Sequence, residues 1–113
     1  ASGNTNAATE GSNAASRTRK KSTDSLTAAG YELFERLRAL RLVIAREEGM
    51  PPYIIFNDKT LIDMCEKLPV DADTMLSVSG VGQNKLMKYG NRFTEEINKF
   101  VSEHPGVVTT LDI

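Results

Sequence analysis

The sequence predicts an all-α fold, a compact bundle of five short helices. Apolar residues recur at spacings of three and four in several segments, which is the period of an amphipathic helix. Proline, glycine and capping residues separate these segments at short intervals, so the connections between helices are short. The run Tyr53–Phe56 could also form a strand, but the chain offers no good partner for it, since Val107–Leu111 is short and terminal. We therefore expect helices packed around a single core.

Length and composition limit the possible functions. With 113 residues, one small domain is expected. The net charge of −1 lacks the basic excess of a dedicated nucleic-acid binder, so any such role must depend on a local patch. A single cysteine, Cys65, excludes an internal disulfide and fits a reducing, intracellular setting. We expect neither a secretory signal nor a membrane span, and one cysteine with one histidine is too few for an ordinary zinc site.

The first helix is expected to run from about Ala28 to Glu48. Gly49 marks its end, and Pro51-Pro52 prevents its continuation. The apolar face has residues spaced three and four apart, namely Leu33, Phe34, Leu37, Leu40 and Ile44, and is broadened by Leu42 and Val43.

The next segment connects this helix to a second one. We interpret Tyr53–Phe56 as a helical-turn connector whose Ile and Phe side chains fill the core. Asn57 and Asp58 are good N-cap candidates for the second helix, and Pro69 ends it. The apolar stripe of this helix comprises Leu61, Ile62, Cys65 and Leu68.

A third and a fourth helix follow in quick succession. Asp71 caps the third helix, near Ala72–Leu76, and its apolar residues Met75 and Leu76 are expected to face inward. The fourth helix, near Gly82–Tyr89, begins directly after a glycine turn.

The fifth helix should run near Asn91–Glu103. Gly90 is expected to break the chain before it, and Pro105-Gly106 terminates it. Its buried face comprises Phe93, Ile97, Phe100 and Val101.

We divide the chain into a linker, a domain and a tail. Residues 1–27 have almost no large apolar side chain, so they cannot offset the entropy of ordering and are expected to form a flexible linker. The basic run Arg17–Lys21 inside it is either solvated or an additional contact to a phosphate backbone. Residues 28–104 form the helical domain, and residues 105–113 a loose tail.

No motif in the chain predicts catalysis. The segment Gly80–Lys85 lacks both the spacing and the preceding strand of a phosphate-binding P-loop. We interpret Asp58 and Asp71 as helix caps, and Asp63 and Glu66 as part of a solvated helix face. A metal-dependent nuclease site is therefore not expected, and neither is a catalytic residue, a metal or a cofactor.

The strongest binding signal is the glycine turn Val78–Gly82. Two glycines let the backbone turn sharply, and the N–H groups of residues 80–83 at a helix start can bind an anion. Helical spacing puts the following basic residues on one side, although Gly90 could bend that alignment. The alternative is that the glycines only pack two helices together and that the lysines are solvated. The expected phosphate contacts are Gly80, Val81, Gly82, Lys85, Lys88 and Arg92.

A second candidate surface combines an aromatic residue with basic residues. Tyr53 follows two prolines that stiffen its backbone, so it could stack on an unpaired base; it could equally cap the core or dock on another domain. Arg38 and Arg41 lie away from the apolar stripe of the first helix and are further candidate phosphate contacts. Acidic residues interleave with them, which favours a solvated, internally neutralised face. The acidic residues of that face are Glu32, Glu35, Glu47 and Glu48.

Two stretches together resemble a known family. The chain resembles the HRDC domain, the helicase-and-RNase-D C-terminal module, in the order and spacing of two stretches. They are Gly49-Met-Pro-Pro-Tyr-Ile-Ile-Phe-Asn-Asp-Lys-Thr-Leu61 and Leu76-Ser-Val-Ser-Gly-Val-Gly82. The turn itself resembles the hairpin of a helix–hairpin–helix element. The resemblance covers roughly residues 28–104. Among HRDC domains, this chain most resembles the one at the C-terminal end of bacterial RecQ-type DNA helicases.

The resemblance implies an auxiliary role in nucleic-acid binding. It implies weak, sequence-independent contact with single-stranded or partly single-stranded DNA, while the ATPase motor lies upstream of this chain. The implied partners are that DNA and the helicase core of the same polypeptide; the implied setting is DNA repair and recombination in the bacterial cytoplasm, near the nucleoid. A monomer is expected. Two alternatives remain: a regulatory module whose acidic side, Asp58–Asp73, docks on the motor, and the HRDC domain of an RNase D-like exoribonuclease.

Overall fold

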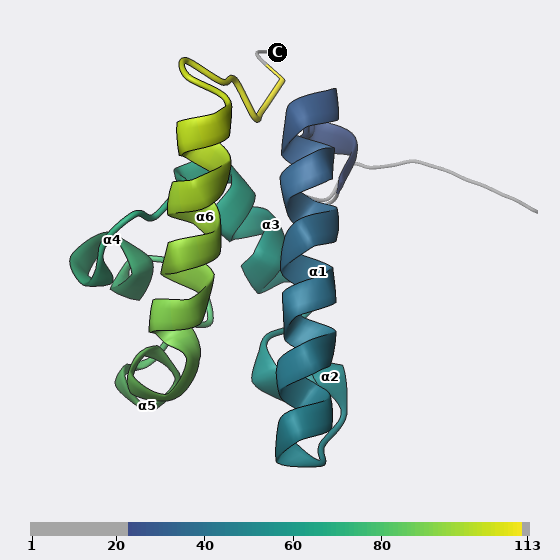
Figure 1. Cartoon of the computed structure of the whole chain (residues 1–113), viewed down its shortest axis with the longest axis vertical. Helices are drawn as coiled ribbons and strands as arrows, with labels where there is room; N and C mark the ends of the chain where they lie inside the picture. The colour runs from purple at the N-terminus through teal and green to yellow at the C-terminus, as the bar shows by residue number, and fades with distance from the viewer. Residues whose placement is uncertain (1–22, 112–113) are drawn as a thin grey trace, which may run out of the picture.

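The regular elements of this protein are all helical within residues 23–111, the part that its computed structural model describes. α1 and α6 form two long antiparallel columns that lie side by side, with α3 behind them (Figure 1). α2 lies beside the lower half of α1, while α4 and α5 lie on the far side of α6 (Figure 1). The elements are η1 (Thr23–Ser25), α1 (Ala28–Glu48), α2 (Pro52–Ile55), α3 (Asp58–Lys67), α4 (Ala72–Leu76), α5 (Gln83–Lys85), η2 (Leu86–Gly90) and α6 (Asn91–Glu103). The all-α prediction is confirmed.

The first helix has the predicted limits. The Thr27 side chain caps α1 by accepting a hydrogen bond from the Gly30 N–H at 3.0 Å. Gly49 ends it in the left-handed region, with φ of 67°, where a residue with a Cβ would be strained. Leu42 and Val43, which were expected to broaden the buried face, are instead exposed.

The predicted connector is also helical. Tyr53–Phe56 forms most of the single-turn helix α2 and its C-cap, and Ile55 and Phe56 are buried as expected, whereas Ile54 is exposed. Asn57 caps α3 by accepting a hydrogen bond from the Thr60 N–H at 2.9 Å.

The chain from α5 to α6 departs from the prediction at Gly90. This residue has φ of −54° and ψ of −40°, so it continues the helix instead of breaking it. The π-helical turn η2 joins α5 to α6, and a change of direction follows (Figure 1). A Cβ at position 90 would lie 2.7 Å from a terminal methyl of Leu86, so a larger residue here would require that side chain to move. Leu76, expected to face inward from α4, is exposed.

The core lies where α1, α2, α3 and α6 meet. The Phe56 ring packs edge-on against Phe93, with ring centroids 5.1 Å apart, and also against Tyr89. Cys65 is fully buried, and desolvation raises the pKa of its thiol to about 12. The completely enclosed side chains also include Leu33, Leu37, Ile44, Leu61, Met64, Met75, Ile97 and Phe100.

The two edges of the domain differ from the expected linker and loose tail. Leu26 and Thr109 are buried, and an antiparallel bridge joins Leu26 to Thr110. The Thr109 hydroxyl donates a hydrogen bond to the Cys65 carbonyl at 2.7 Å, which fixes this segment to α3. The ordered unit therefore extends beyond the expected range 28–104 on both sides. The basic run Arg17–Lys21 lies outside the described residues.

Candidate nucleic-acid interface

A buried carboxylate anchors the glycine turn. Asp63 of α3 is fully buried and accepts a hydrogen bond from the Ser79 N–H at 2.8 Å. Lys67 lies 3.0 Å from the same carboxylate and donates to the Ser77 carbonyl at 2.9 Å. The expectation that Asp63 belongs to a solvated face is wrong: four apolar neighbours in sequence draw it into the core, where the turn and Lys67 satisfy it. Its place in the apolar run Leu61–Cys65 was the available signal.

The two glycines of the turn have different reasons to be there. Gly80 has φ of 88°, and a Cβ on it would lie 2.3 Å from the Thr60 hydroxyl oxygen. Both the backbone conformation and the close approach to α3 therefore require glycine at position 80. Gly82 has an ordinary φ of −95° and open space around its missing side chain. Only Gly80 serves the fold.

The amides of the turn are partly available. Val81 is buried and its N–H donates to the Val78 carbonyl, so the expected contribution of Val81 to anion binding is wrong. Gly80 and Gly82 are exposed, and their N–H groups make no hydrogen bond within residues 23–111. Because α5 has only three residues, individual N–H groups matter here more than a helix dipole.

The basic residues after the turn fall into two groups. Lys85 lies with its ammonium 5.8 Å from the centroid of the Phe56 ring, and Lys88 is exposed on η2. Neither forms an ion pair within the described part of the chain. Arg92, on the other side of the π-helical turn, is bound by Glu47 at 2.6 and 3.3 Å. The expected alignment of three free cations is therefore reduced to the two lysines.

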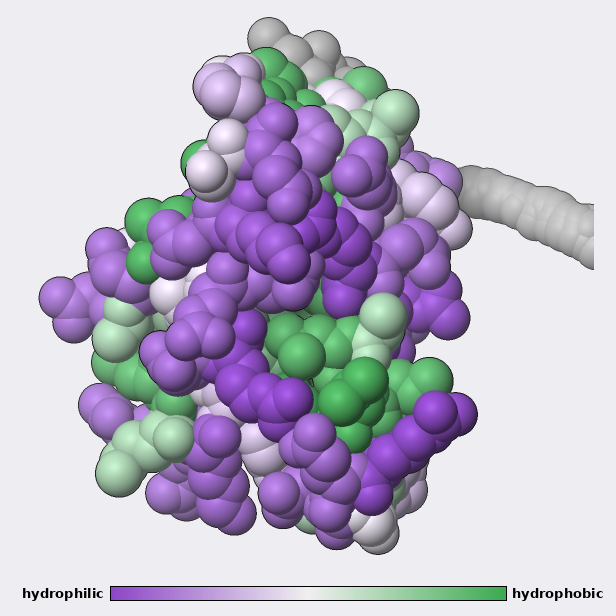
Figure 2. Space-filling model, in the orientation of Figure 1, coloured by the Kyte–Doolittle hydropathy of each residue, from purple (hydrophilic) through white to green (hydrophobic). Residues whose placement is uncertain are grey.

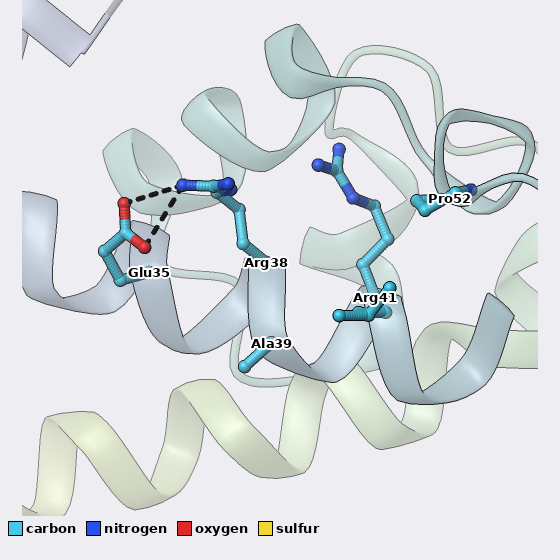
Figure 3. Close-up of a pocket in the computed structure, with 6 residues that line it drawn as sticks. Glu35, Arg38, Ala39, Arg41 and Pro52 are labelled. Atoms are coloured by element: carbon cyan, nitrogen blue, oxygen red, sulfur yellow. Dashed lines mark hydrogen bonds and ion pairs between the residues drawn. The ribbon is translucent and has the colours of Figure 1, made fainter. Parts of the chain in front are cut away.

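Arg38 and Arg41 project from the same side of α1 and line a pocket of about 270 Å³ (Figure 3). Arg38 donates to both carboxylate oxygens of Glu35, at 3.0 and 3.2 Å. Arg41 donates to the Phe56 carbonyl at 3.0 Å and to Asp58 at 2.8 Å, and its side chain is only 12% exposed. Arg41 thus ties α1 to the end of α2 and the start of α3, which leaves it little capacity for another ligand.

Tyr53 is the most exposed aromatic residue of this surface, at 66%. It follows Pro52, which lines the same pocket as the two arginines. Ile54, the next residue of α2, is also exposed, as are Leu42 and Val43 on α1, and Leu42 lines the same pocket as Pro52. Figure 2 shows apolar side chains gathered over the lower half of α1, surrounded by hydrophilic ones. Sequence reasoning placed Leu42 and Val43 inside, so it missed that both are exposed.

The described residues contain neither a cluster of metal ligands nor a membrane-spanning helix. Between Thr23 and Leu111, no three His, Cys, Asp or Glu side chains come close enough together to hold a metal ion. No helix in this range is long and apolar enough to cross a membrane.

The fold and the glycine turn together define an HRDC domain. The family model of the HRDC domain matches residues 31–97, and the chain belongs to this family. The resemblance stated from the motifs is confirmed.

The curated relatives that the chain matches are DNA helicases. The chain is 51% identical over 69 residues to the ATP-dependent DNA helicase RecQ of Bacillus subtilis, and 42% identical over 77 residues to that of Haemophilus influenzae. These matches cover 61% and 68% of this chain, and the chain spans only 12% of the length of each relative. It is also 40% identical over 60 residues to the ATP-dependent DNA helicase UvrD2 of Mycobacterium tuberculosis, covering 53% of this chain and 9% of UvrD2.

A solved structure supports the same assignment. The third HRDC domain of RecQ from D. radiodurans superimposes with a TM-score of 0.62 at 28% sequence identity. The match covers 64% of this chain and 95% of that domain.

Proposed function

We propose that this chain is the auxiliary DNA-binding module of a RecQ-like helicase and makes weak, sequence-independent contact with single-stranded or partly single-stranded DNA. The supporting observation is the glycine turn, where two exposed glycine residues with free amides are followed by lysines that have no carboxylate partner within residues 23–111. Gly80 and Gly82 supply the amides, and Lys85 and Lys88 supply the charge. Contacts of this kind hold a phosphate backbone without reading its sequence.

Tyr53 adds a second mode of contact. Its ring is exposed on the short helix α2, which two prolines stiffen. A base of an unpaired strand can stack on such a ring, whereas a base inside a duplex cannot reach it. This contact gives the module its preference for exposed strands.

The module acts through its connection to a larger protein. The chain spans about one eighth of the length of the helicases that it resembles. Tethering raises the local concentration of DNA near the module, so weak intrinsic binding becomes useful. In this proposal the module is a monomer without a cofactor, and the motor of the same polypeptide supplies the catalysis. The whole helicase would act in DNA repair and recombination in the bacterial cytoplasm, near the nucleoid.

Docking on the helicase core is the second candidate function. Tyr53 and Ile54 are adjacent exposed residues of α2, and Leu42 and Val43 are exposed on α1; large apolar side chains left in water are typical of contact with another protein domain. The acidic side Asp58–Asp73 supports this less than expected, because Asp63 is buried and Asp58 is bound by Arg41. The RNase D-like parent is less well supported, since the relatives described above are helicases.

An amide chemical-shift titration with a short single-stranded oligonucleotide at low salt tests the DNA-binding function. We expect shifts at Gly80, Gly82, Lys85 and Lys88, with a smaller set around Tyr53. Binding should weaken steeply with added salt, with the logarithm of affinity linear in the logarithm of salt concentration. Shifts at none of these residues, even at the lowest salt, would leave docking on the helicase core as the better function.

A further inference from the structure

The candidate DNA-contacting arginines share a feature that the lysines lack. Each arginine is already bound by a carboxylate of the same chain. The pairs are Arg92 with Glu47, Arg38 with Glu35, and Arg41 with Asp58. Lys85 and Lys88 have no such partner in the part of the chain between Thr23 and Leu111.

The pair between Arg92 and Glu47 has the geometry that a phosphate would use. One guanidinium nitrogen lies 2.6 Å from one carboxylate oxygen, and the other nitrogen lies 3.3 Å from the second oxygen. A guanidinium binds carboxylate and phosphate through this same two-pronged arrangement. Glu47 therefore occupies the donors that a DNA phosphate would need.

Glu47 is fully ionised at neutral pH. The hydrogen bond from Arg92 lowers the pKa of the Glu47 carboxyl, and the charge of Arg92 acts in the same direction. The carboxylate thus competes with phosphate at full charge at neutral pH.

Position distinguishes this pair from the other two. Arg92 is 41% exposed, so a phosphate can approach its guanidinium, and it is only four residues after Lys88 in the sequence. Arg41 is largely buried and also holds the Phe56 carbonyl, so the fold itself requires it.

Arg38 and Glu35 pair along one helix, three residues apart, and make no link between elements. Glu47, by contrast, is on α1 and Arg92 on α6.

On the basis of the proposed function, we propose that Glu47 limits the DNA affinity of this module by competing with phosphate for Arg92. In the free protein the carboxylate holds the guanidinium, and a strand must displace it before Arg92 can contribute. Lys85 and Lys88 make the primary contact with the DNA phosphates, and Arg92 contributes only after its ion pair with Glu47 has dissociated.

The test is Glu47→Gln, which keeps the size of the side chain and removes its charge. We measure binding of a fluorescein-labelled oligothymidylate by fluorescence anisotropy over a series of salt concentrations. An exposed ion pair of this kind is weak, so removing the competitor should raise affinity by about two- to fivefold at low salt. One more phosphate contact should also steepen the salt dependence of a single-strand complex by about 0.7 in log–log slope.

Glu48→Gln is the matched control. Glu48 is the next residue on α1, is exposed, and forms no ion pair within the described range. Its substitution changes the net charge by the same amount but frees no guanidinium. We expect a smaller rise in affinity and an unchanged salt slope for this variant.

Arg92→Gln completes the comparison. In the unmodified chain this change should have little effect, because Glu47 already holds the guanidinium. In the Glu47→Gln background it should remove the whole gain in affinity and restore the original salt slope. Circular dichroism of all variants checks that the helix content is unchanged.

The outcomes separate this inference from the proposed function. If the unmodified chain binds and Lys85→Glu with Lys88→Glu abolishes binding, but Glu47→Gln behaves like Glu48→Gln, the role of Glu47 is refuted and the DNA-binding function stands. If the unmodified chain binds too weakly to detect and Glu47→Gln binds, the competition is supported. If no variant binds at any salt concentration, both proposals fail.

Discussion

The glycine turn and the α1–α2 surface carry similar numbers of basic residues but use them differently. At the turn, the buried Asp63 fixes the backbone. Lys85 and Lys88 have no carboxylate partner among residues 23–111. On the α1–α2 surface, Arg38 and Arg41 are both engaged, and the exposed groups are aromatic and apolar. A basic residue in a sequence therefore indicates charge but not availability, because an arginine that holds the fold together has little capacity for a ligand.

The largest expected effect comes from the glycine that the turn requires. Gly80→Ala should destabilise the protein by about 2–4 kcal/mol, since it adds a left-handed residue with a Cβ and a clash with Thr60. Urea unfolding, monitored by circular dichroism, measures this change in the free energy of unfolding. Gly82→Ala is the matched control and should change the free energy of unfolding by less than about 1 kcal/mol. Equal losses at both positions would contradict the assignment of different roles to these glycines.

The buried carboxylate should have the next largest effect. Asp63→Asn keeps the side-chain size but removes the charge that Lys67 and the Ser79 N–H bind, so we expect a loss of about 1–3 kcal/mol. Chemical denaturation gives the value, and amide shifts at Ser79 and Gly80 should report a rearranged turn. The exposed Asp73→Asn serves as control, with a change within about 0.5 kcal/mol. A neutral result at position 63 would mean that packing alone fixes the turn.

DNA binding tests the two regions against each other. Lys85→Glu with Lys88→Glu should lower affinity for single-stranded DNA by at least about tenfold and reduce the salt slope by about 1.4, the value for two lost phosphate contacts. Arg38→Glu with Arg41→Glu, with folding checked first because Arg41 is structural, should have a smaller effect. Fluorescence anisotropy with a short oligonucleotide measures both. A greater loss from the arginine pair would transfer the main phosphate contact to α1.

Tyr53 should show the smallest effect and the most selective one. Tyr53→Ala should weaken binding of single-stranded DNA by about fivefold, the lower end expected for one stacked base, and should leave duplex binding nearly unchanged. Because the ring is exposed, the free energy of unfolding should not change measurably. Tyr53→Phe should retain the single-strand affinity, since it keeps the ring. An equal loss on single and double strands would indicate that stacking is not its role.

Local signals in the sequence were sufficient to predict the helices. Gly49 ends α1, and Asn57 and Asp71 cap α3 and α4 where expected, because each acts on backbone groups within a few residues of itself. Motifs of the same local kind, around Tyr53 and Gly80, were sufficient to identify the family.

The availability of each site residue depended on contacts between distant parts of the chain. Glu47 meets Arg92 across 45 residues, and Arg41 meets Asp58 across 17. The buried carboxylate of Asp63 accepts a hydrogen bond from Ser79, sixteen residues away. Thr109 reaches Cys65 over 44 residues, which orders a tail that its own sequence did not predict to be ordered.

The sequence by itself therefore determined the limits of α1, α3 and α4, the glycine turn and the family, since capping, backbone conformation and apolar spacing are local properties of the chain. Only the tertiary structure decided which cations are free and which carboxylates are buried. The reason is physical: whether a charge is exposed or paired depends on its surroundings in space, and those are made by residues far away in sequence.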